Sequence, residues 1–297
     1  MNIRDLEYFD CLCETRSFTK AAEKLFISQP SVTLAINRLE KELGSKLVIR
    51  SHSNKEIQIT ESGHILRKRA ENILHEINEA KLEIKKLDSK KIKLGIPPII
   101  GAYFFPKFIS ELIQNGFIEN IEFVQAGSLK MKELLLTGQI DMALMGSLEP
   151  INDEAIKSHL LKKDNFVICV GKDNHLIDNE VLNFSKLKDE QFIVLEDGYL
   201  HNSVLKRLLK RDKIEPQKVY YANEIQTAKS LIAANLGVGI MIKMAVEKMQ
   251  DISTIELENK IDFYISIATK KGHYSTKIEK DIIKIIVDKN EELEGNL

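Results

Sequence analysis

The fold of the N-terminal part is decided by residues 17–44, SFTKAAEKLFISQPSVTLAINRLEKELG. Ser17 and Ser28 each stand directly before apolar residues at helical spacing, and serine is a preferred residue at the N-cap of a helix. The second of these runs ends at Gly44, and glycine is common just after the last residue of a helix. The stretch therefore predicts two helices joined by a tight turn.

The segments on either side extend this unit. Apolar residues at helical spacing predict a further helix over residues 3–13. Two short apolar runs, residues 47–50 and 57–59, are separated by a polar loop and predict a β-hairpin. A long helix then begins at Thr60. This order predicts a winged helix-turn-helix over residues 1–60.

The long helix carries an unbroken heptad pattern. Its apolar positions are spaced alternately by four and three residues, which is the pattern of a two-stranded coiled coil. We therefore expect residues 61–89 to form a linker helix that pairs two chains. The residues of this predicted seam are Leu66, Ala70, Ile73, Ile77, Ala80, Ile84 and Leu87.

From Ile92 onward, predicted strands alternate with predicted helices, as in an α/β domain. Residues 140–145 are almost entirely apolar, which is typical of a parallel strand covered on both faces. A helix is expected over residues 101–113, and short strands are expected over residues 166–170 and 263–268.

Composition narrows the class of protein. The 297 residues carry a formal net charge of −1, yet residues 16–55 hold eight Lys or Arg against three Glu. Such a window indicates either a nucleic-acid footprint or a chance cluster on a solvated surface. The three cysteines have no disulfide-framework spacing, which favours a reducing compartment. The charged N-terminus and the lack of a long apolar run predict a cytoplasmic protein with no membrane partner.

Motifs for metals, phosphates and dinucleotides are absent from the sequence. The G-x-G at residues 236–240 follows a predicted helix and lacks the third glycine of a dinucleotide fingerprint, so it predicts a helix end and entry into a strand. Cys169 lies in an apolar run, which indicates a buried, inert thiol rather than a nucleophile. We expect no cofactor, no metal site and no enzymatic activity.

The N-terminal residues resemble the signature of LysR-type transcription regulators. The resemblance is specific over residues 1–65, and beyond them it depends on strand order and length. The matching segments are SFTKAAEKL at 17–25, SQPSVT at 28–33, INRLEKELG at 36–44, LVIR at 47–50 and TESG at 60–63.

The resemblance implies a sensor domain similar to a periplasmic binding protein. Residues 90–163 with 266–297 would form one subdomain and residues 164–265 the other. Two strands would cross between the subdomains, near Lys163–Val167 and Tyr264–Ala268. The resemblance further implies a dimer or tetramer that binds double-stranded DNA, is controlled by a small-molecule effector and contacts RNA polymerase.

DNA contact is expected from the start of the second helix of the helix-turn-helix. A recognition helix enters the major groove, so its first residues must be short or polar. Gln29 suits a bidentate contact with adenine, and Thr33 offers a hydroxyl and a methyl group. Helix capping alone would explain Ser28 but not the basic surround. The expected DNA-contacting residues are Ser28, Gln29, Pro30, Ser31, Thr33, Arg38, Arg50, Ser53 and Lys55.

The resemblance assigns Arg50 to a phosphate or the minor groove. Many relatives carry a second basic residue at the position of Ser53, and a polar or basic residue at that of Leu34. The departures at these two positions put base readout in question, and Lys55 is the alternative source of charge in the wing.

The resemblance places the effector between the two subdomains. Helix N-termini there offer free N–H groups to an anion, so a small organic anion is expected. Ser128 is expected to cap the next helix, to bind the effector, or both. Glu224 either favours an amine or caps a helix. The expected effector-contacting residues are Pro98, Ile99, Ile100, Gly101, Gly127, Ser128, Leu129, Gly146, Tyr199, His201 and Glu224.

Two other functions are compatible with the same two-lobed fold. One is a solute-binding protein, against which the missing signal peptide argues. The other is an enzyme, against which the missing catalytic constellation argues.

Overall fold

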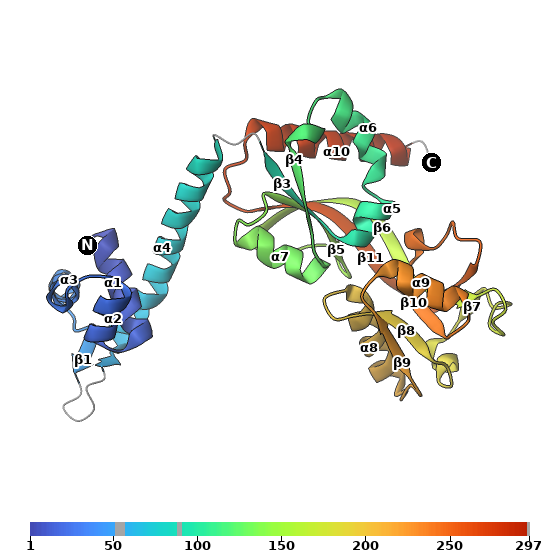
Figure 1. The fold of residues 1–297 in the computed structure, drawn as a ribbon, viewed down its shortest axis with the longest axis horizontal. Helices are drawn as coiled ribbons and strands as arrows, with labels where there is room; N and C mark the ends of the chain where they lie inside the picture. Colours follow the sequence, from blue (N-terminus) through green and yellow to red (C-terminus); the bar gives the residue numbers. More distant parts are fainter. Residues whose placement is uncertain (51–56, 88–90, 296–297) are drawn as a thin grey trace. The chain divides into compact units, whose positions relative to one another are not determined.

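The structure is a computed structural model in which residues 1–50, 57–87 and 91–295 are described. The chain divides into two compact units, Met1–Asp88 and Ser89–Leu297 (Figure 1). Each unit has its own hydrophobic core. The first unit has the predicted helix-turn-helix with its hairpin, and the second has the predicted two-lobed α/β fold.

The first unit is helical apart from one short hairpin. Its helices begin and end close to the predicted residues, because the sequence supplies the caps. The elements are α1 (Ile3–Thr15), α2 (Phe18–Lys24), α3 (Gln29–Leu43), β1 (Val48–Arg50), β2 (Ile57–Ile59) and α4 (Glu61–Leu87).

The predicted caps form. The Ser17 hydroxyl oxygen accepts a hydrogen bond from the N–H of Lys20, and that of Ser28 accepts one from the N–H of Ser31, each at 3.4 Å. Gly44 follows α3 with a left-handed φ of 64°, which a residue with a side chain adopts at a cost. Both ends of α3 are therefore set by local sequence.

A buried carboxylate joins the hairpin to α3. Glu40 accepts hydrogen bonds from the N–H groups of Leu47 and Val48, at 2.9 and 3.4 Å. It also pairs with the ammonium of Lys46 at 2.6 Å. These bonds compensate a buried charge that would otherwise be costly. They fix where the hairpin leaves the helical core.

The first half of α4 belongs to the same core. Leu66 and Ala70 are buried within the first unit, where α4 packs on α1. These two residues are therefore not available to a partner chain, and this part of the predicted seam is corrected. A heptad pattern does not show whether the apolar positions pack against a helix of a partner chain or against one of the same chain, because both kinds of packing bury the same residues. Further along α4, Ile73 and Ile84 are exposed.

The second unit is built on one mixed sheet. Within residues 91–295, nine strands form this sheet in the order β4-β3-β5-β11-β6-β10-β8-β9, with β7 beside β11. The strands are β3 (Ile92–Ile96), β4 (Ile121–Gln125), β5 (Met142–Ser147), β6 (Ile156–Gly171), β7 (Val181–Leu182), β8 (Phe192–Leu195), β9 (Val219–Ala222), β10 (Val238–Ile242) and β11 (Ile252–Lys270). The helices are α5 (Pro98–Tyr103), α6 (Pro106–Gln114), α7 (Ser128–Leu136), α8 (Leu200–Asp212), α9 (Ile225–Ala233) and α10 (Lys277–Gly295).

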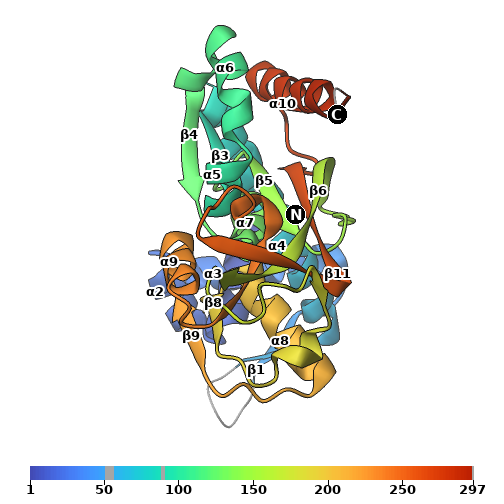
Figure 2. The same ribbon diagram turned by 90° about the vertical axis from the view of Figure 1, so that its right-hand side faces the viewer.

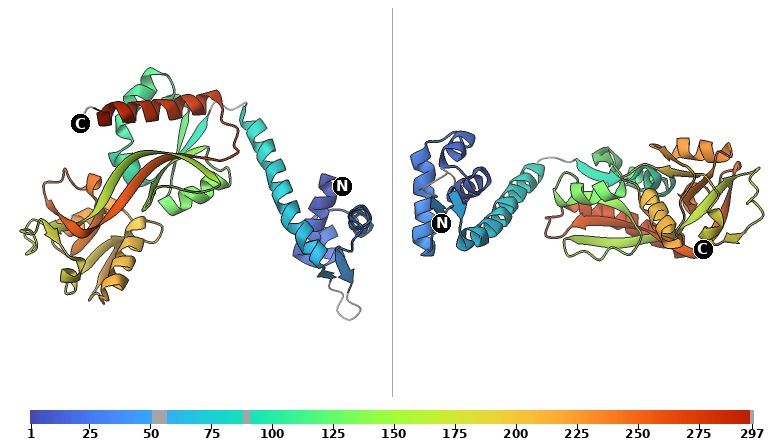
Figure 3. Two further views of the ribbon diagram at one scale, coloured as in Figure 1. Left: turned by 180° about the vertical axis from the view of Figure 1, so that it is seen from behind. Right: turned by 90° about the horizontal axis from the view of Figure 1, so that it is seen from below.

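Two long antiparallel strands, β6 and β11, connect the two lobes of this unit (Figure 3). Parallel strands β3, β4 and β5 make the first lobe, and parallel strands β8, β9 and β10 make the second. β6 joins β10 from Phe166, within the predicted crossing at Lys163–Val167. β11 pairs with β5 over residues 264–269, so it crosses before Tyr264 rather than at the predicted Tyr264–Ala268.

Helices α6 and α10 pack side by side on the first lobe (Figure 2). The single helix predicted over residues 101–113 is two helices, α5 and α6. The N–H groups of Phe104 and Phe105 both bond to the carbonyl of Ile100, which ends α5. Pro106 has no N–H to continue the ladder and instead begins α6.

Strand β6 is much longer than the predicted strand at residues 166–170. In its first half, residues 156–165, only Ile156 and Leu161 are buried, and the other residues are mostly polar, so no apolar run reveals the strand. Among the described residues, the helices are all too short or too polar to cross a membrane.

Candidate DNA interface and effector cleft

The N-terminal end of α3 is an exposed polar surface. Ser28, Gln29 and Pro30 are exposed, and Ser31 and Thr33 are half-buried. The hydroxyl groups of Ser28 and Ser31 lie 2.8 Å apart, and the Thr33 hydroxyl donates to the carbonyl of Gln29 at 3.2 Å. The Gln29 side chain is therefore the group of this set with the most freedom to reach a base edge.

Arg38 has a partner within the first unit. Its Nε donates to the buried carboxylate of Asp5 at 3.1 Å, and its Nη2 pairs with the other oxygen of that carboxylate. The bidentate hydrogen bond to Asp5 raises the pKa of the Arg38 guanidinium. Arg38 thus links α3 to α1, and a role toward DNA would use only its outward N–H groups.

The helix-turn-helix also exposes two apolar side chains, of which sequence reasoning singled out only Leu34. Phe26, between α2 and α3, is 95% exposed and has a left-handed φ of 55°. Leu34, one turn into α3, is 58% exposed. The exposure of Phe26 could have been predicted from its place in the short turn before Ser28, where burial of a side chain is not expected.

The wing is described only at its base. Arg50 is the last residue of β1 and pairs with Ile57 of β2, but its side chain lies outside the described part of the chain. Ser53 and Lys55 also lie outside the described residues.

The second half of α4 carries the part of the predicted seam that remains open. Ile73 and Ile84 are 39% and 66% exposed, Ile77 is half-buried and Ala80 is exposed. The side chain of Leu87 lies outside the described part of the chain.

The predicted effector residues gather in part between the two lobes of the second unit. A small cavity there, of about 20 Å³, is lined mainly by apolar side chains. Of the predicted residues it brings together Pro98, Ile99, Ile100, Ser128, Tyr199 and His201; the others that line it are Pro97, Leu200, Ile242 and Phe263.

The remaining predicted effector residues do not line this cavity. Gly101 faces Ile96, and Gly146 lies beneath Phe263 and the Ser128 hydroxyl. Leu129 is exposed on α7. The other two are Gly127 and Glu224.

Ser128 does not cap α7, so that prediction was wrong. The N-cap is Gly127, and Ser128 is the first helical residue, with no capping bond from a side chain. Among the described residues the Ser128 hydroxyl has no hydrogen-bond partner, and it lies at the edge of the cavity. Glu224 occupies the N-cap position of α9 but makes no side-chain capping bond, and it is exposed.

His201 is the polar group buried most deeply in the cleft. Its side chain is 2% exposed, and neither ring nitrogen has a hydrogen-bond partner in the described structure. The ring of Phe166 packs against it edge-on, with centroids 5.2 Å apart. Burial lowers the pKa of His201 to about 3, so the imidazole is neutral. A buried polar group without a partner calls for a reason, and a bound ligand is one.

Two further contacts between the lobes lie outside this cavity. Gly127 of the first lobe lies so close to the carbonyl of Gly198 that a Cβ on Gly127 would overlap it. Tyr103 of α5 accepts hydrogen bonds from Lys229 and from Gln226 of α9, the latter at 3.2 Å. Lys229 is 2% exposed. The cleft is thus closed in this structure.

Sequence reasoning missed the Tyr103–Lys229 contact. The signal was Lys229 itself, a long charged side chain on the otherwise apolar face of α9, next to Ala228 and Ile232. Charged residues are rarely fully buried without a partner, so the position of Lys229 predicts a polar partner for its amine.

Two family models match the chain. "Bacterial regulatory helix-turn-helix protein, lysR family" matches residues 3–64, and "LysR substrate binding domain" matches residues 85–290. The chain belongs to the LysR family. The resemblance seen in the sequence is confirmed, and so is the division into a helix-turn-helix part and an α/β sensor part.

Relatives of this LysR protein are similar over nearly the whole chain. The "Malolactic fermentation system transcriptional activator" of Lactococcus lactis is 31% identical over 290 residues, covering 96% of this chain and 98% of the relative. "HTH-type transcriptional regulator CatR" of Pseudomonas putida is 29% identical over 290 residues, covering 94% and 96%. These relatives are named as transcriptional regulators, which are not enzymes.

Solved structures share the fold of this LysR protein. Full-length BenM has a TM-score of 0.55 at 24% identity, covering 100% of this chain and 97% of BenM. The effector binding domain of QuiR, in complex with shikimate, has a TM-score of 0.59 at 21% identity. It covers 68% of this chain and 97% of the QuiR domain.

Proposed function

We propose that this protein is a sequence-specific DNA-binding transcription regulator controlled by a small-molecule effector that binds between the two lobes of its sensor unit. The observation that carries the effector part is His201, a neutral imidazole in an apolar cleft whose ring nitrogens both lack a partner among the residues that the structure describes. The DNA part is supported by family membership and by the exposed polar start of α3.

The lining of the cleft favours a ligand of mixed character. Pro98, Ile99 and Ile100 offer apolar contact, while Ser128 and His201 offer two hydrogen-bonding groups that are otherwise unused. A neutral imidazole donates through one nitrogen and accepts through the other. The effector we propose is therefore a small molecule with a hydrocarbon part, whose oxygen atoms reach Ser128 and His201. The partial positive charge at the N-terminus of α7, where Ser128 is the first helical residue, favours an organic anion.

Binding must be coupled to movement of the lobes. A cavity of about 20 Å³ is far below the size of ordinary ligand sites, which is roughly 300–1,000 Å³. The effector can shift the protein only by binding one arrangement of the lobes better than the other. We infer that the Gly127–Gly198 and Tyr103–Lys229 contacts are the ones that change.

The active form we propose is a dimer or a tetramer. Two reading heads are needed to contact two half-sites on successive turns of DNA. The exposed part of the α4 seam, from Ile73 to Ile84, is the surface proposed to pair the chains. Contact with RNA polymerase is part of the same proposal.

Thiol-based sensing fits this chain less well than ligand binding. Some relatives are named as hydrogen peroxide-inducible genes activators, such as that of Haemophilus influenzae at 27% identity. Here all three cysteines are buried. Burial raises the pKa of Cys13 to about 12 and also raises that of Cys169, whereas oxidation requires an accessible thiolate.

The DNA part is tested by binding at several salt concentrations. A duplex found by genomic footprinting should be bound more tightly than a scrambled duplex of equal length. Gln29→Ala should weaken the footprinted duplex by about 1–3 kcal/mol and the scrambled one much less. The matched control is Gln114→Ala, an exposed glutamine of the sensor unit. An equal loss on both duplexes would show that Gln29 contacts the DNA backbone only.

The effector part is tested by a thermal-stability screen of small organic acids on the full-length protein. A binder should stabilise the protein, and Ser128→Ala should reduce that ligand-induced shift. A binder whose effect is unchanged in both Ser128→Ala and His201→Leu would contradict the assigned cleft.

A further inference from the structure

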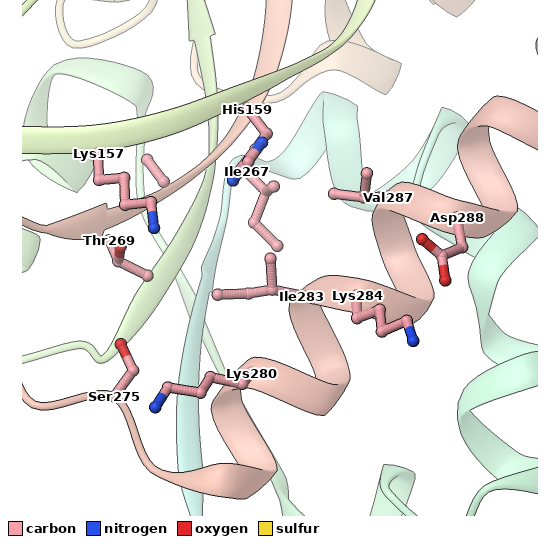
Figure 4. Close-up of a pocket in the computed structure, with 11 residues that line it drawn as sticks. Lys157, His159, Ile267, Thr269, Ser275, Lys280, Ile283, Lys284, Val287 and Asp288 are labelled. Atoms are coloured by element: carbon pink, nitrogen blue, oxygen red, sulfur yellow. The ribbon is translucent and has the colours of Figure 1, made fainter.

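A second and larger cavity lies in the sensor unit, outside the cleft between the lobes. Its volume is about 310 Å³, and it sits between helix α10 and the ends of strands β6 and β11 that belong to the first lobe (Figure 4). None of its lining residues lines the cleft cavity. It is therefore a separate site in the fold.

The middle of this cavity is largely apolar, although the exposed His159 of β6 also lines it beside Ile267 (Figure 4). Ile267 of β11 is buried at its floor, and Ile283 and Val287 reach toward it from one face of α10, four residues apart (Figure 4). Side chains at this spacing lie one above the other on a helix, so they form a continuous hydrocarbon surface.

One end of the cavity is polar and basic. The amines of Lys157 and Lys280 and the hydroxyls of Thr269 and Ser275 gather there (Figure 4). Lys157 and Thr269 are cross-strand neighbours in the register of β6 and β11, so the sheet itself holds them together. Lys280 comes from the first turns of α10, on the opposite wall.

The basic groups at this end lack acidic partners. In the part of the chain that the structure describes, the side-chain amines of Lys157 and Lys280 are exposed and form no ion pair or hydrogen bond, and the amine of Lys280 lies 6.0 Å from the ring centroid of Tyr274. The whole cavity is lined by three lysines and a single aspartate, Asp288, which lies at the far end beside Lys284 (Figure 4). The cavity therefore carries an uncompensated positive charge next to an apolar surface.

We propose that this cavity is a second ligand site, for a small carboxylate that carries a hydrocarbon chain or ring. The carboxylate lies between Lys157 and Lys280 and accepts hydrogen bonds from both amines and from the two hydroxyl groups. The hydrocarbon part lies on Ile267, Ile283 and Val287. The volume is at the lower end of that of ordinary ligand sites, which suits a molecule of this size.

The combination of charge and apolar surface excludes two simpler ligands. An inorganic anion would bind the lysines but leave the apolar surface exposed to water. A neutral hydrocarbon would cover that surface but make no use of the two ammonium groups. A molecule with both parts uses the basic end and the apolar middle of the lining together.

The test is isothermal titration of the full-length protein with sodium hexanoate as the probe, with acetate and hexan-1-ol as half-probes. Hexanoate should bind measurably at millimolar concentration, and each half-probe should bind at least tenfold more weakly. The double variant Lys157→Gln/Lys280→Gln should weaken hexanoate at least tenfold, because charge-assisted hydrogen bonds are the strong ones. Ile283→Asn should weaken hexanoate but not acetate.

The matched control is Lys248→Gln/Lys277→Gln, which removes the same charge from exposed lysines outside the cavity. Hexanoate affinity should be unchanged in this control and in the cleft variant His201→Leu. The proposal is overturned if hexanoate does not bind, if acetate binds as well as hexanoate, or if the control weakens binding as much as the cavity variant. Binding that is lost in His201→Leu and kept in Lys157→Gln/Lys280→Gln would assign hexanoate to the cleft and equally overturn it.

Discussion

Replacing His201 by leucine should stabilise the sensor unit when no ligand is bound. The imidazole is buried, and within the described part of the chain neither nitrogen is paired; leaving a buried polar group unsatisfied costs about 1–3 kcal/mol. Leucine removes that cost but also loses the edge-on contact with Phe166, which is worth about 0.5–1.5 kcal/mol. The expected net gain at neutral pH is about 1 kcal/mol of unfolding free energy, or roughly 2–4 °C for a unit of this size.

The gain should grow in acid, and its sign follows from the lowered pKa. The folded state holds the pKa of His201 at about 3, whereas an unfolded chain has a histidine pKa of about 6.5. Below pH 6.5 the unfolded chain therefore binds a proton that the folded chain does not. The native protein loses about 1.4 kcal/mol per pH unit from this group, down to the folded pKa. The advantage of His201→Leu should rise to about 3 kcal/mol at pH 5.

The assay is urea denaturation of the full-length protein, followed by hydrogen exchange of peptides from the sensor unit, at two pH values. His64→Leu is a matched control, because His64 is exposed on α4 in the other unit and should leave the sensor peptides unchanged. A destabilised His201→Leu would refute the reasoning. So would an advantage that is the same at pH 7.5 and pH 5, because the histidine would then be solvated or paired.

Three further changes test other parts of the structure. Ile77→Asp places a charge on the proposed pairing surface of α4, so sedimentation should show loss of the dimer, and an unchanged oligomer would remove that surface from consideration. Gly127→Ala adds a Cβ that overlaps the Gly198 carbonyl, so small-angle scattering of the ligand-free protein should show a more open sensor unit; an identical profile would mean that the lobes are already apart in solution. Glu40→Ala leaves the N–H groups of Leu47 and Val48 without their acceptor, so urea denaturation should show the first unit weakened by about 2–4 kcal/mol, while a change below about 0.5 kcal/mol would mean that water replaces the carboxylate.

Sequence reasoning succeeded where the cause is local. Ser17 and Ser28 cap their helices and Gly44 follows α3, because each interaction is made with residues three or four positions away. The first half of β6 was not predicted, because its residues are mostly polar and only partly buried, and pairing with β11 is what makes it a strand.

The effector site divides in the same way. His201 was among the expected effector residues, and it lies in the cleft. Ser128 was wrongly expected to be an N-cap, because a serine next to a glycine leaves the cap position ambiguous by one residue and the glycine took it. Tyr103 and Lys229 lie 126 positions apart in the chain, so only the closed fold brings them together.

The place where α4 leaves the core of the first unit sets a rule for building hybrid proteins from this one. A junction at Thr60 would delete Leu66 and Ala70 and leave the α1 surface that they cover open to water. A junction beyond Leu74, which packs at the edge of that core, would keep the reading head whole. A sensor domain from another protein joined there would be fused to an intact DNA-binding unit. The linker helix of that sensor would then determine which chains pair in the hybrid.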